Sequence, residues 1–324
     1  MNSNIPQLGM LGFGAAGIGN LYRAMDDDVA AAALAAGWDA GIRYFDTAPH
    51  YGLGLSERRV GAFLSGMPRE EFVISTKVGR VLEPVANPTG AKDAEGFDVP
   101  ADVVRRWDPS EAGIRRSIED SLERTGLASI DIAYLHDPDV YDLQAGIKQA
   151  LPALVRLREE GLVKAIGVGA NSADALRDCV LGSDLDIIML AGRYSLLEQP
   201  AAVDLMPLCL ERGVGIANVG VYNSGLLARP VVPENANYNY APAPVEILAR
   251  AKALAACCDE FGVELPAAAL QFAVSHPAVC TVVVGASNAR QITETAARMA
   301  AAIPAELWTA LVSRGLLDAE LVHA

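Results

Sequence analysis

The chain has 324 residues, of which 52% are hydrophobic and 20% are charged. This composition excludes an intrinsically disordered protein, because disorder requires low hydrophobicity and high net charge. The formal net charge of −14 argues against nucleic-acid and anionic-membrane partners, which need clustered Lys and Arg. No run of about 18 apolar residues occurs, so we expect no membrane-spanning helix.

Short apolar runs rich in β-branched residues alternate with helical runs along the chain. We expect strands at 8–14, 44–48, 72–78, 130–136, 163–170, 185–190, 214–220 and 281–285. We expect helices at 27–40, 55–64, 109–126 (with Asp108 as its N-cap), 142–161, 172–181, 199–212, 245–261, 266–275, 289–300 and 304–316. Eight strand–helix units predict one (β/α)8 TIM barrel domain over residues 1–324, and the rival fold is an open doubly wound sheet.

Two long polar insertions, at 79–108 and 221–244, follow the third and the seventh expected strands. Loops that follow strands lie at the C-terminal face of a barrel, where the active sites of barrel enzymes lie. We therefore expect both insertions to border the functional site.

The five cysteines are spread along the chain without the spacing of a metal site, so we expect reduced thiols and no metal. The first ten residues lack the basic and apolar regions of a signal peptide. We expect a cytoplasmic protein that is a monomer or a weak homo-oligomer and acts on a small molecule.

Residues 12–17 read GFGAAG and match the weak dinucleotide pattern GxGxxG. A Rossmann turn would open a helix directly and would have an acidic residue about 20 residues later, and neither is present here. The alternative is a glycine-rich segment where the main chain approaches another part of the protein closely, and we favour it.

Four residues with complementary chemistry fall at or just after the ends of strands two, three and four. Asp46 lies at the end of an apolar strand, Tyr51 lies in the next loop, and Lys77 and His136 lie at the ends of the following two strands. In a barrel these positions converge. An ammonium group favours the phenolate form of a nearby tyrosine, and a carboxylate keeps a buried lysine charged. A histidine can orient a substrate oxygen, so the set suits proton transfer to or from an alcohol or carbonyl oxygen, coupled to hydride transfer.

The segments that carry these residues are DTAPHYGLGLSE, STKVG and IDIAYLHDP, the last preceded by IRRSIEDSLERTGL. Together they resemble the aldo-keto reductase family over nearly the whole chain. The resemblance implies Tyr51 as the general acid/base, Lys77 and Asp46 as the groups that tune it, and His136 as the group that orients the substrate. It also implies NAD or NADP bound across the barrel mouth without a Rossmann domain.

The same resemblance implies a set of cofactor-binding positions. Asn171 follows strand five, Val219 stands where the family commonly has a nicotinamide-stacking Tyr, and NSGLL resembles the loop over the pyrophosphate. GASNARQITE resembles the adenosine-phosphate site, with Arg290 as the cation of this segment, so we favour NAD over NADP. The full set is Gly14, Asn171, Val219, Asn223, Ser224, Gly225, Leu227, Gly285, Ser287, Arg290, Gln291 and Glu294.

The segments HDP, AGRYSLLEQ and NVGVYNSGLL are similar to one branch of the family. Enzymes of that branch oxidise the C1 hydroxyl of aldoses such as L-fucose, L-galactose or D-arabinose to the lactone, or oxidise pyridoxal. A general aldehyde or ketone reductase and a non-catalytic nucleotide-binding protein are the alternatives. His50 and Trp107 are candidate substrate contacts, with loop packing as the alternative for each.

Overall fold

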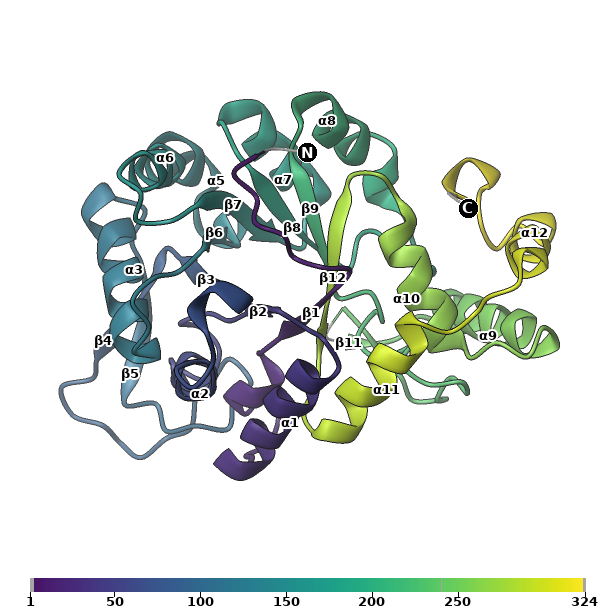
Figure 1. The fold of residues 1–324 in the computed structure, drawn as a ribbon, viewed down its shortest axis with the longest axis horizontal. Helices are drawn as coiled ribbons and strands as arrows, with labels where there is room; N and C mark the ends of the chain where they lie inside the picture. The colour runs from purple at the N-terminus through teal and green to yellow at the C-terminus, as the bar shows by residue number, and fades with distance from the viewer. Residues whose placement is uncertain (1–2, 240, 323–324) are drawn as a thin grey trace.

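The computed structural model describes residues 3–239 and 241–322, and Figure 1 shows its fold. Eight parallel strands form a closed barrel in the order β1-β12-β9-β8-β7-β6-β3-β2. These strands are β1 (Leu11–Gly14), β2 (Tyr44–Asp46), β3 (Val73–Val78), β6 (Ile132–His136), β7 (Ala165–Ala170), β8 (Ile187–Ala191), β9 (Gly215–Val219) and β12 (Val279–Gly285). The predicted TIM barrel is confirmed.

The barrel closes where its first strand lies between its second and its last. Gly14 at the end of β1 is in register with Gly285 of β12 on one side and with Asp46 of β2 on the other. Figure 1 shows the consequence for the outer layer, where α11 lies beside α1 although they come from opposite ends of the chain. Closure leaves the eight-stranded sheet without an edge and brings the C-terminal strand ends to one mouth.

Helices cover the outside of the barrel, and α9 and α12 form an additional layer next to α10 (Figure 1). None of the helices in the described part of the chain is long and apolar enough to cross a bilayer. The helices are α1 (Asp27–Asp39), α2 (Leu55–Leu64), α3 (Glu111–Thr125), α4 (Pro138–Tyr141), α5 (Leu143–Ala145), α6 (Leu151–Glu159), α7 (Ala173–Gly182), α8 (Leu205–Arg212), α9 (Val245–Glu260), α10 (Leu265–Ser275), α11 (Ala289–Met299) and α12 (Ala305–Ser313).

The helix expected at 142–161 is not continuous. After α5 the chain forms a π-helical turn, Gly146–Ala150, before α6 begins. Pro152 lies in the first turn of α6 and has no N–H, so it cannot donate the regular α-helical hydrogen bond to the residue four positions earlier. A π-helical turn is one way in which a helix accommodates such a local break.

The expected N-cap of α3 is wrong by two residues. The Ser110 hydroxyl caps the helix by accepting a hydrogen bond from Gly113 N at 3.1 Å. Asp108 instead accepts hydrogen bonds from the main-chain N–H of Ser110 at 3.1 Å and from its hydroxyl at 2.6 Å. The carboxylate closes a turn with the residue two positions on, and the chain enters the helix only after Pro109.

The insertion at 79–108 contains a hairpin that the sequence did not reveal. Its strands, β4 (Arg80–Pro84) and β5 (Val103–Trp107), pair antiparallel, with Arg80 opposite Trp107 and Leu82 opposite Arg105. The insertion at 221–244 carries the two-residue strands β10 (Asn237–Tyr238) and β11 (Ala241–Pro242). Because both insertions follow barrel strands, they stand at the mouth, as predicted.

Apolar side chains fill the barrel and support the mouth from below. A second apolar layer between strands and helices includes the buried thiols Cys179, Cys209, Cys257 and Cys258. Burial of each large apolar side chain contributes about 1.5–3 kcal/mol. The interior cluster comprises Leu8, Tyr44, Val73, Ile132, Tyr134, Ala165, Ile187, Met189, Ala217 and Val283.

Candidate active site

The four residues that the sequence singled out meet at the mouth of the barrel. Asp46 ends β2, Lys77 is the penultimate residue of β3, and His136 ends β6. Tyr51 lies in the loop between β2 and α2. Its ring centre is 4.6 Å from Lys77 Nζ and 6.0 Å from the ring centre of His136. Three adjacent strands therefore place one ammonium, one carboxylate and one imidazole around a phenol.

Asp46 and Lys77 form a buried ion pair with few unused polar atoms. Lys77 Nζ donates hydrogen bonds to Asp46 Oδ2 at 2.6 Å and to the carbonyl of Thr47 at 3.1 Å. The Ser75 hydroxyl donates to the other carboxylate oxygen at 2.7 Å, and Tyr44 Oη lies 2.9 Å from Ser75 Oγ. Such pairs persist in a protein interior when their remaining atoms are also hydrogen-bonded. Removing either partner would leave an uncompensated buried charge.

The ion pair acts on the proton affinity of Tyr51. Burial lowers the pKa of Lys77, but the Asp46 carboxylate and Tyr51 raise it by more, so Lys77 is held as a cation. Burial raises the pKa of Tyr51, Lys77 opposes this effect, and the Asp46 charge adds to the rise. The Lys77 contribution has the expected sign, but burial exceeds it and the pKa of Tyr51 lies above its usual value. Tyr51 is therefore a neutral phenol at pH 7.

Glycines fix the main chain of Tyr51. Gly52 has φ of +63°, and a Cβ there would overlap the carbonyl oxygen of Gly19. A Cβ on Gly19 would lie 2.9 Å from the carbonyl carbon and oxygen of Tyr51. Earlier in the same segment, a Cβ on Gly17 would lie 3.2 Å from the carbonyl oxygen of Ala286. The close-approach interpretation of residues 12–17 is confirmed at Gly17, and Gly19, which follows that segment, supports the loop that carries Tyr51.

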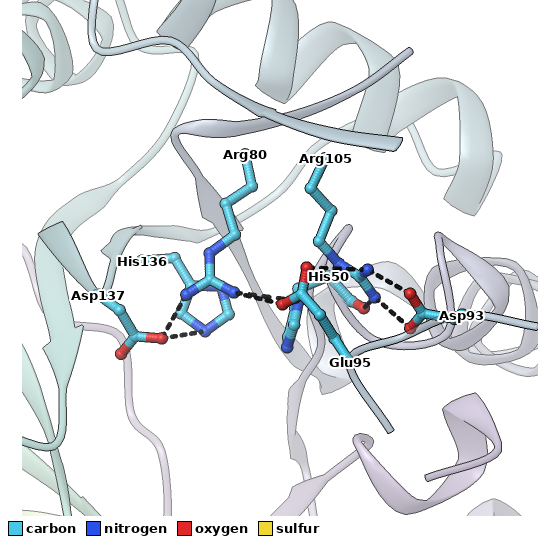
Figure 2. Close-up of polar contacts among 7 residues, drawn as sticks. All are labelled: His50, Arg80, Asp93, Glu95, Arg105, His136 and Asp137. Carbon is cyan, nitrogen blue, oxygen red and sulfur yellow. Dashed lines mark hydrogen bonds and ion pairs between the residues drawn. The ribbon is translucent and has the colours of Figure 1, made fainter. Parts of the chain in front are cut away.

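A buried arginine from the hairpin connects the residues around His136, as Figure 2 shows. Arg80 Nη2 donates a hydrogen bond to Asp137 Oδ2 at 2.6 Å, and Arg80 Nη1 lies 3.1 Å from His50 Nδ1. Arg80 Nη1 is also 3.9 Å from Glu95 Oε2. One guanidinium thus holds three side chains on the same wall of the site.

A second arginine of the hairpin anchors the chain beside Tyr51. Arg105 forms a two-point ion pair with Asp93, at 2.7 and 2.8 Å, and donates a hydrogen bond to the main-chain carbonyl of His50 at 2.9 Å (Figure 2). The side chains of Arg105 and Asp93 are almost fully buried. Charge-assisted pairs with this fork geometry are among the strongest polar contacts in proteins, so the hairpin holds the residue that precedes Tyr51.

Both histidines of the site are neutral at pH 7. Burial, followed by the charges of Arg80 and Arg105, lowers the pKa of His50 to about 3. Burial, with Arg80 and then Lys77, lowers the pKa of His136 well below its usual value. His136 Nδ1 is buried without a hydrogen-bond partner among the described residues, whereas Nε2 lies 3.5 Å from Asp137 Oδ2. We therefore assign the single imidazole proton of His136 to Nε2.

A cavity of about 390 Å³ opens directly above these groups. His50, Tyr51, Lys77 and His136 line it together with Glu95, Phe97 and Asp137. Two further cavities, of about 680 and 480 Å³, adjoin it in sequence. Each cavity shares lining residues with the next, which shows that they are continuous. The three form one groove that runs from Tyr51, past the 221–244 insertion, to the first turns of α11.

Seven of the twelve expected cofactor positions line this groove: Asn171, Val219, Asn223, Ser224, Gly225, Gly285 and Gln291. Asn223 Oδ1 is buried without a partner among the described residues, while its Nδ2 donates a hydrogen bond to Glu198 at 2.9 Å. An extended ligand with hydrogen-bond donors fits such a groove, as a dinucleotide does.

The structure does not bring the other five expected cofactor positions to the lining of this groove. Gly14, the last residue of β1, pairs with Gly285 and Asp46, Leu227 is fully buried in the core, and Ser287 hydrogen-bonds to Gln291. Arg290 and Glu294 form an ion pair at 3.4 Å on α11, with 79% of the Arg290 side chain exposed. Since α11 begins at the groove, Arg290 and Glu294 stand near the end of the groove but do not form its wall.

The two expected substrate contacts differ in position. His50 lines the cavity, and its ring centre is 5.4 Å from that of His136. Trp107 stacks on Tyr141 at 4.9 Å between ring centres and covers Gly79, where a Cβ would overlap its ring. Trp107 is not among the residues that line the cavity. Its large side chain packs the base of the hairpin.

Sequence reasoning missed Arg80, Glu95, Arg105 and Asp137, and at the far end of the groove it missed Arg229 and Arg298. Two signals were available for the first group. Asp137 directly follows His136 at a strand end, and the segment VVRRW is rich in the β-branched and aromatic residues that favour a strand. Nothing in the local pattern of residues 80–105 indicates which side chains point inward.

This geometry supports proton transfer at an oxygen atom bound between Tyr51 and His136. The Tyr51 phenol can donate the proton and its phenolate can accept it, Lys77 stabilises the phenolate, and His136 Nε2–H can donate to the same oxygen. The adjoining groove has the length and shape for a cofactor that exchanges hydride with the carbon attached to that oxygen.

Comparison with known proteins agrees with the site. A sequence profile of the aldo/keto reductase family matches residues 10–314. The chain is 52% identical over 309 residues to D-threo-aldose 1-dehydrogenase of Pseudomonas sp, covering 95% of this chain and 94% of that protein. It is 40% identical over 325 residues to pyridoxal 4-dehydrogenase of Microbacterium luteolum, with the same coverage.

Among solved structures, the holo form of an aldo-keto reductase from Bacillus halodurans superimposes with a TM-score of 0.75 at 27% identity. The superposition covers 97% of this chain and 96% of that one. The profile match, the two relatives and the barrel lead to the same conclusion: this chain belongs to the aldo/keto reductase family and is an NAD(P)-dependent oxidoreductase.

Proposed function

We propose that this protein oxidises the C1 hydroxyl of an aldose, such as L-fucose, L-galactose or D-arabinose, to the lactone with NAD(P)⁺ as the acceptor. The observation that carries this proposal is the 52% identity, over 95% of the chain, to a protein named as an aldose 1-dehydrogenase. The cavity supports it, because Glu95, Asp137 and His50 line it with groups that bind the hydroxyls of a polar, uncharged ligand.

In the proposed reaction Tyr51 takes the proton from the C1 hydroxyl while the hydrogen on C1 leaves as hydride. Lys77 stabilises the phenolate that must form first, and Asp46 keeps Lys77 charged. His136 Nε2–H donates a hydrogen bond to the reacting oxygen and fixes its orientation between the two side chains. The nicotinamide, when bound, supplies the two-electron acceptor, so the C1–H and O–H bonds break and a carbonyl forms.

The groove indicates which residues would hold the cofactor. Asn171 and Val219 lie nearest the four catalytic candidates, Asn223, Ser224 and Gly225 follow, and Gly285 and Gln291 border the far end. We propose NAD rather than NADP. The two arginines of α11, Arg290 and Arg298, are each paired with a carboxylate, so Arg229 is the further arginine lining this end of the groove, and the positive charge for an additional phosphate is small.

A second candidate function, oxidation of pyridoxal, is favoured by the 40% identity to a pyridoxal 4-dehydrogenase. Reduction of simple aldehydes or ketones is the third reaction that the same catalytic groups can support. All three reactions use the same proton-transfer groups and differ in the cavity contacts.

The test is formation of NADH and NADPH with L-fucose, L-galactose, D-arabinose and pyridoxal in parallel. We expect turnover of the sugars, with NAD⁺ preferred. Replacing Tyr51→Phe should lower kcat by at least about 100-fold without weakening NADH binding, because only the proton acceptor is lost. Tyr141→Phe is the matched control, since that ring stacks on Trp107 outside the cavity. Turnover of pyridoxal or simple aldehydes alone, or an active Tyr51→Phe enzyme, would refute the proposal.

A further inference from the structure

Asp137 has an unusual backbone and an unusual side-chain direction. It has φ of 43° and ψ of 57°, in the left-handed region that residues other than glycine adopt uncommonly. It stands at the N-cap of α4, where an aspartate normally caps the helix, yet its side chain makes no capping hydrogen bond. The carboxylate turns instead toward the cavity beside His136 (Figure 2). Sparsely populated backbone conformations of this kind cluster at active sites and ligand-binding segments.

Arg80 fixes this carboxylate and leaves one of its oxygens for a ligand. The guanidinium binds Oδ2 at 2.6 Å and is itself almost fully buried, with 6% of its side chain exposed. Oδ2 also lies 3.5 Å from His136 Nε2. No described residue donates a hydrogen bond to Oδ1, which Figure 2 shows without a contact. Asp137 therefore presents a fixed, acceptor-only oxygen next to the nitrogen that orients the reacting oxygen.

The other carboxylate of the cavity lies elsewhere. Glu95 Oε2 is 3.7 Å from His50 Nδ1, and 47% of the Glu95 side chain is exposed. Of the two carboxylates that line this cavity, only Asp137 adjoins His136.

The chemistry of an aldose indicates what this oxygen would bind. In the ring form, the reacting carbon C1 has two neighbours, the ring oxygen and C2. The ring oxygen only accepts hydrogen bonds, so it is not a partner for a carboxylate. The hydroxyl on C2 donates, and it is adjacent to the oxygen held by Tyr51 and His136.

We propose that Asp137, positioned by Arg80, accepts a hydrogen bond from the C2 hydroxyl of the substrate and so selects aldoses that carry that hydroxyl. The inference rests on the proposed oxidation of aldoses at C1. A hydrogen bond to a charged group corresponds to about 10- to 100-fold in kcat/KM. A site built around a substrate hydroxyl discriminates most strongly against the analogue that lacks it.

The experiment is a cycle of two substrates and two enzymes. D-arabinose and 2-deoxy-D-ribose differ at C2, since the second sugar is the 2-deoxy form of the first. Asp137→Gly removes the carboxylate and tolerates the left-handed backbone, and Asp137→Ala is the second variant. Asp139→Ala is the matched control, because it removes an exposed charge two residues away, outside the cavity. Thermal melting checks that each variant is folded.

The wild type should prefer D-arabinose over 2-deoxy-D-ribose by about 10- to 100-fold in kcat/KM. Asp137→Gly should lose most of this preference by losing activity toward D-arabinose, while Asp139→Ala keeps it. A variant that loses activity equally toward both sugars would overturn the inference, and so would a wild type without a preference. A wild-type enzyme that oxidises no aldose would instead refute the proposed function, and the inference with it.

Discussion

Replacing Gly19→Ala tests whether the glycine-rich loop positions the catalytic candidate Tyr51. Gly19 lies in a short 3-10 turn with a backbone that alanine can adopt, since its φ is not positive. The substitution adds one methyl group. That methyl would lie 2.9 Å from the carbonyl carbon and oxygen of Tyr51. The perturbation therefore acts on the main chain of Tyr51 and leaves its phenol chemically unchanged.

The size of the effect follows from this contact. Ordinary contacts of a Cβ begin near 3.4 Å, so Tyr51 or Gly19 must move by the difference from 2.9 Å, about 0.5 Å. A displacement of 1 Å in a catalytic group can cost about 100-fold in rate, so we expect about tenfold here. Overpacking lowers the free energy of unfolding by about 1–3 kcal/mol, whereas the lower conformational entropy of the unfolded alanine variant raises it by about 0.4–1 kcal/mol. We expect a net loss of about 1–2 kcal/mol in the free energy of unfolding.

The assay compares kcat at saturating substrate and cofactor, NADH affinity by fluorescence titration, and urea unfolding. Gly66→Ala is the matched control, because its backbone is also not left-handed and the nearest atom to its new Cβ is 3.6 Å away. We expect Gly66→Ala to keep kcat within about twofold. Wild-type kcat in a folded Gly19→Ala enzyme would refute the reasoning. An equal loss in both variants would show that the contact with Tyr51 is not the cause.

Three further predictions concern charge. In Lys77→Met the pKa of Tyr51 should rise because a cation that lowers it is lost. The kcat/KM–pH profile for oxidation should therefore move to higher pH, and activity on its acid limb should fall about tenfold for each pH unit of that shift. An unmoved profile would contradict this role of Lys77. His50 stays neutral in the folded protein down to about pH 3, whereas the unfolded chain binds a proton near pH 6.5, so stability is lost as pH falls between these values. In His50→Gln the free energy of unfolding should therefore fall less steeply, by about 1.4 kcal/mol per pH unit between pH 6 and pH 4, and parallel slopes in urea unfolding would refute this. Arg290→Ala should weaken NADPH binding a few-fold and leave NADH binding unchanged, because Arg290 stands near the end of the groove, outside its wall, where we expect only the extra phosphate of NADPH to approach it. Equal effects on both cofactors in fluorescence titrations would exclude that contact.

The local pattern of the sequence determined the barrel and the four residues at its mouth. Strand and helix periods repeat eight times, and a right-handed crossover between parallel strands leaves few alternatives for their arrangement. The barrel then fixes where each strand ends. Asp46, Lys77 and His136 are at or next to strand ends, so their convergence followed from chain position alone.

Boundaries and loops were less predictable. Ser110 rather than Asp108 caps the helix because its hydroxyl accepts from Gly113 N, whereas the Asp108 carboxylate accepts from the N–H of Ser110 before the helix begins. The expected contact from Trp107 did not reach the cavity, because its ring is used to cover Gly79. In each case several conformations agree with the local sequence, and packing selects one.

Only the tertiary structure decided the wall of the cavity and the state of its ionisable groups. Arg80 and Asp137 are 57 residues apart, and their contact depends on how the β4–β5 hairpin folds over β6. No short-range period encodes that approach. The pKa of Tyr51 likewise depends on burial, which exceeds the opposing effect of Lys77. The sequence determines which groups reach the mouth because strand ends converge, whereas their surroundings depend on contacts between distant segments that form only when the barrel closes.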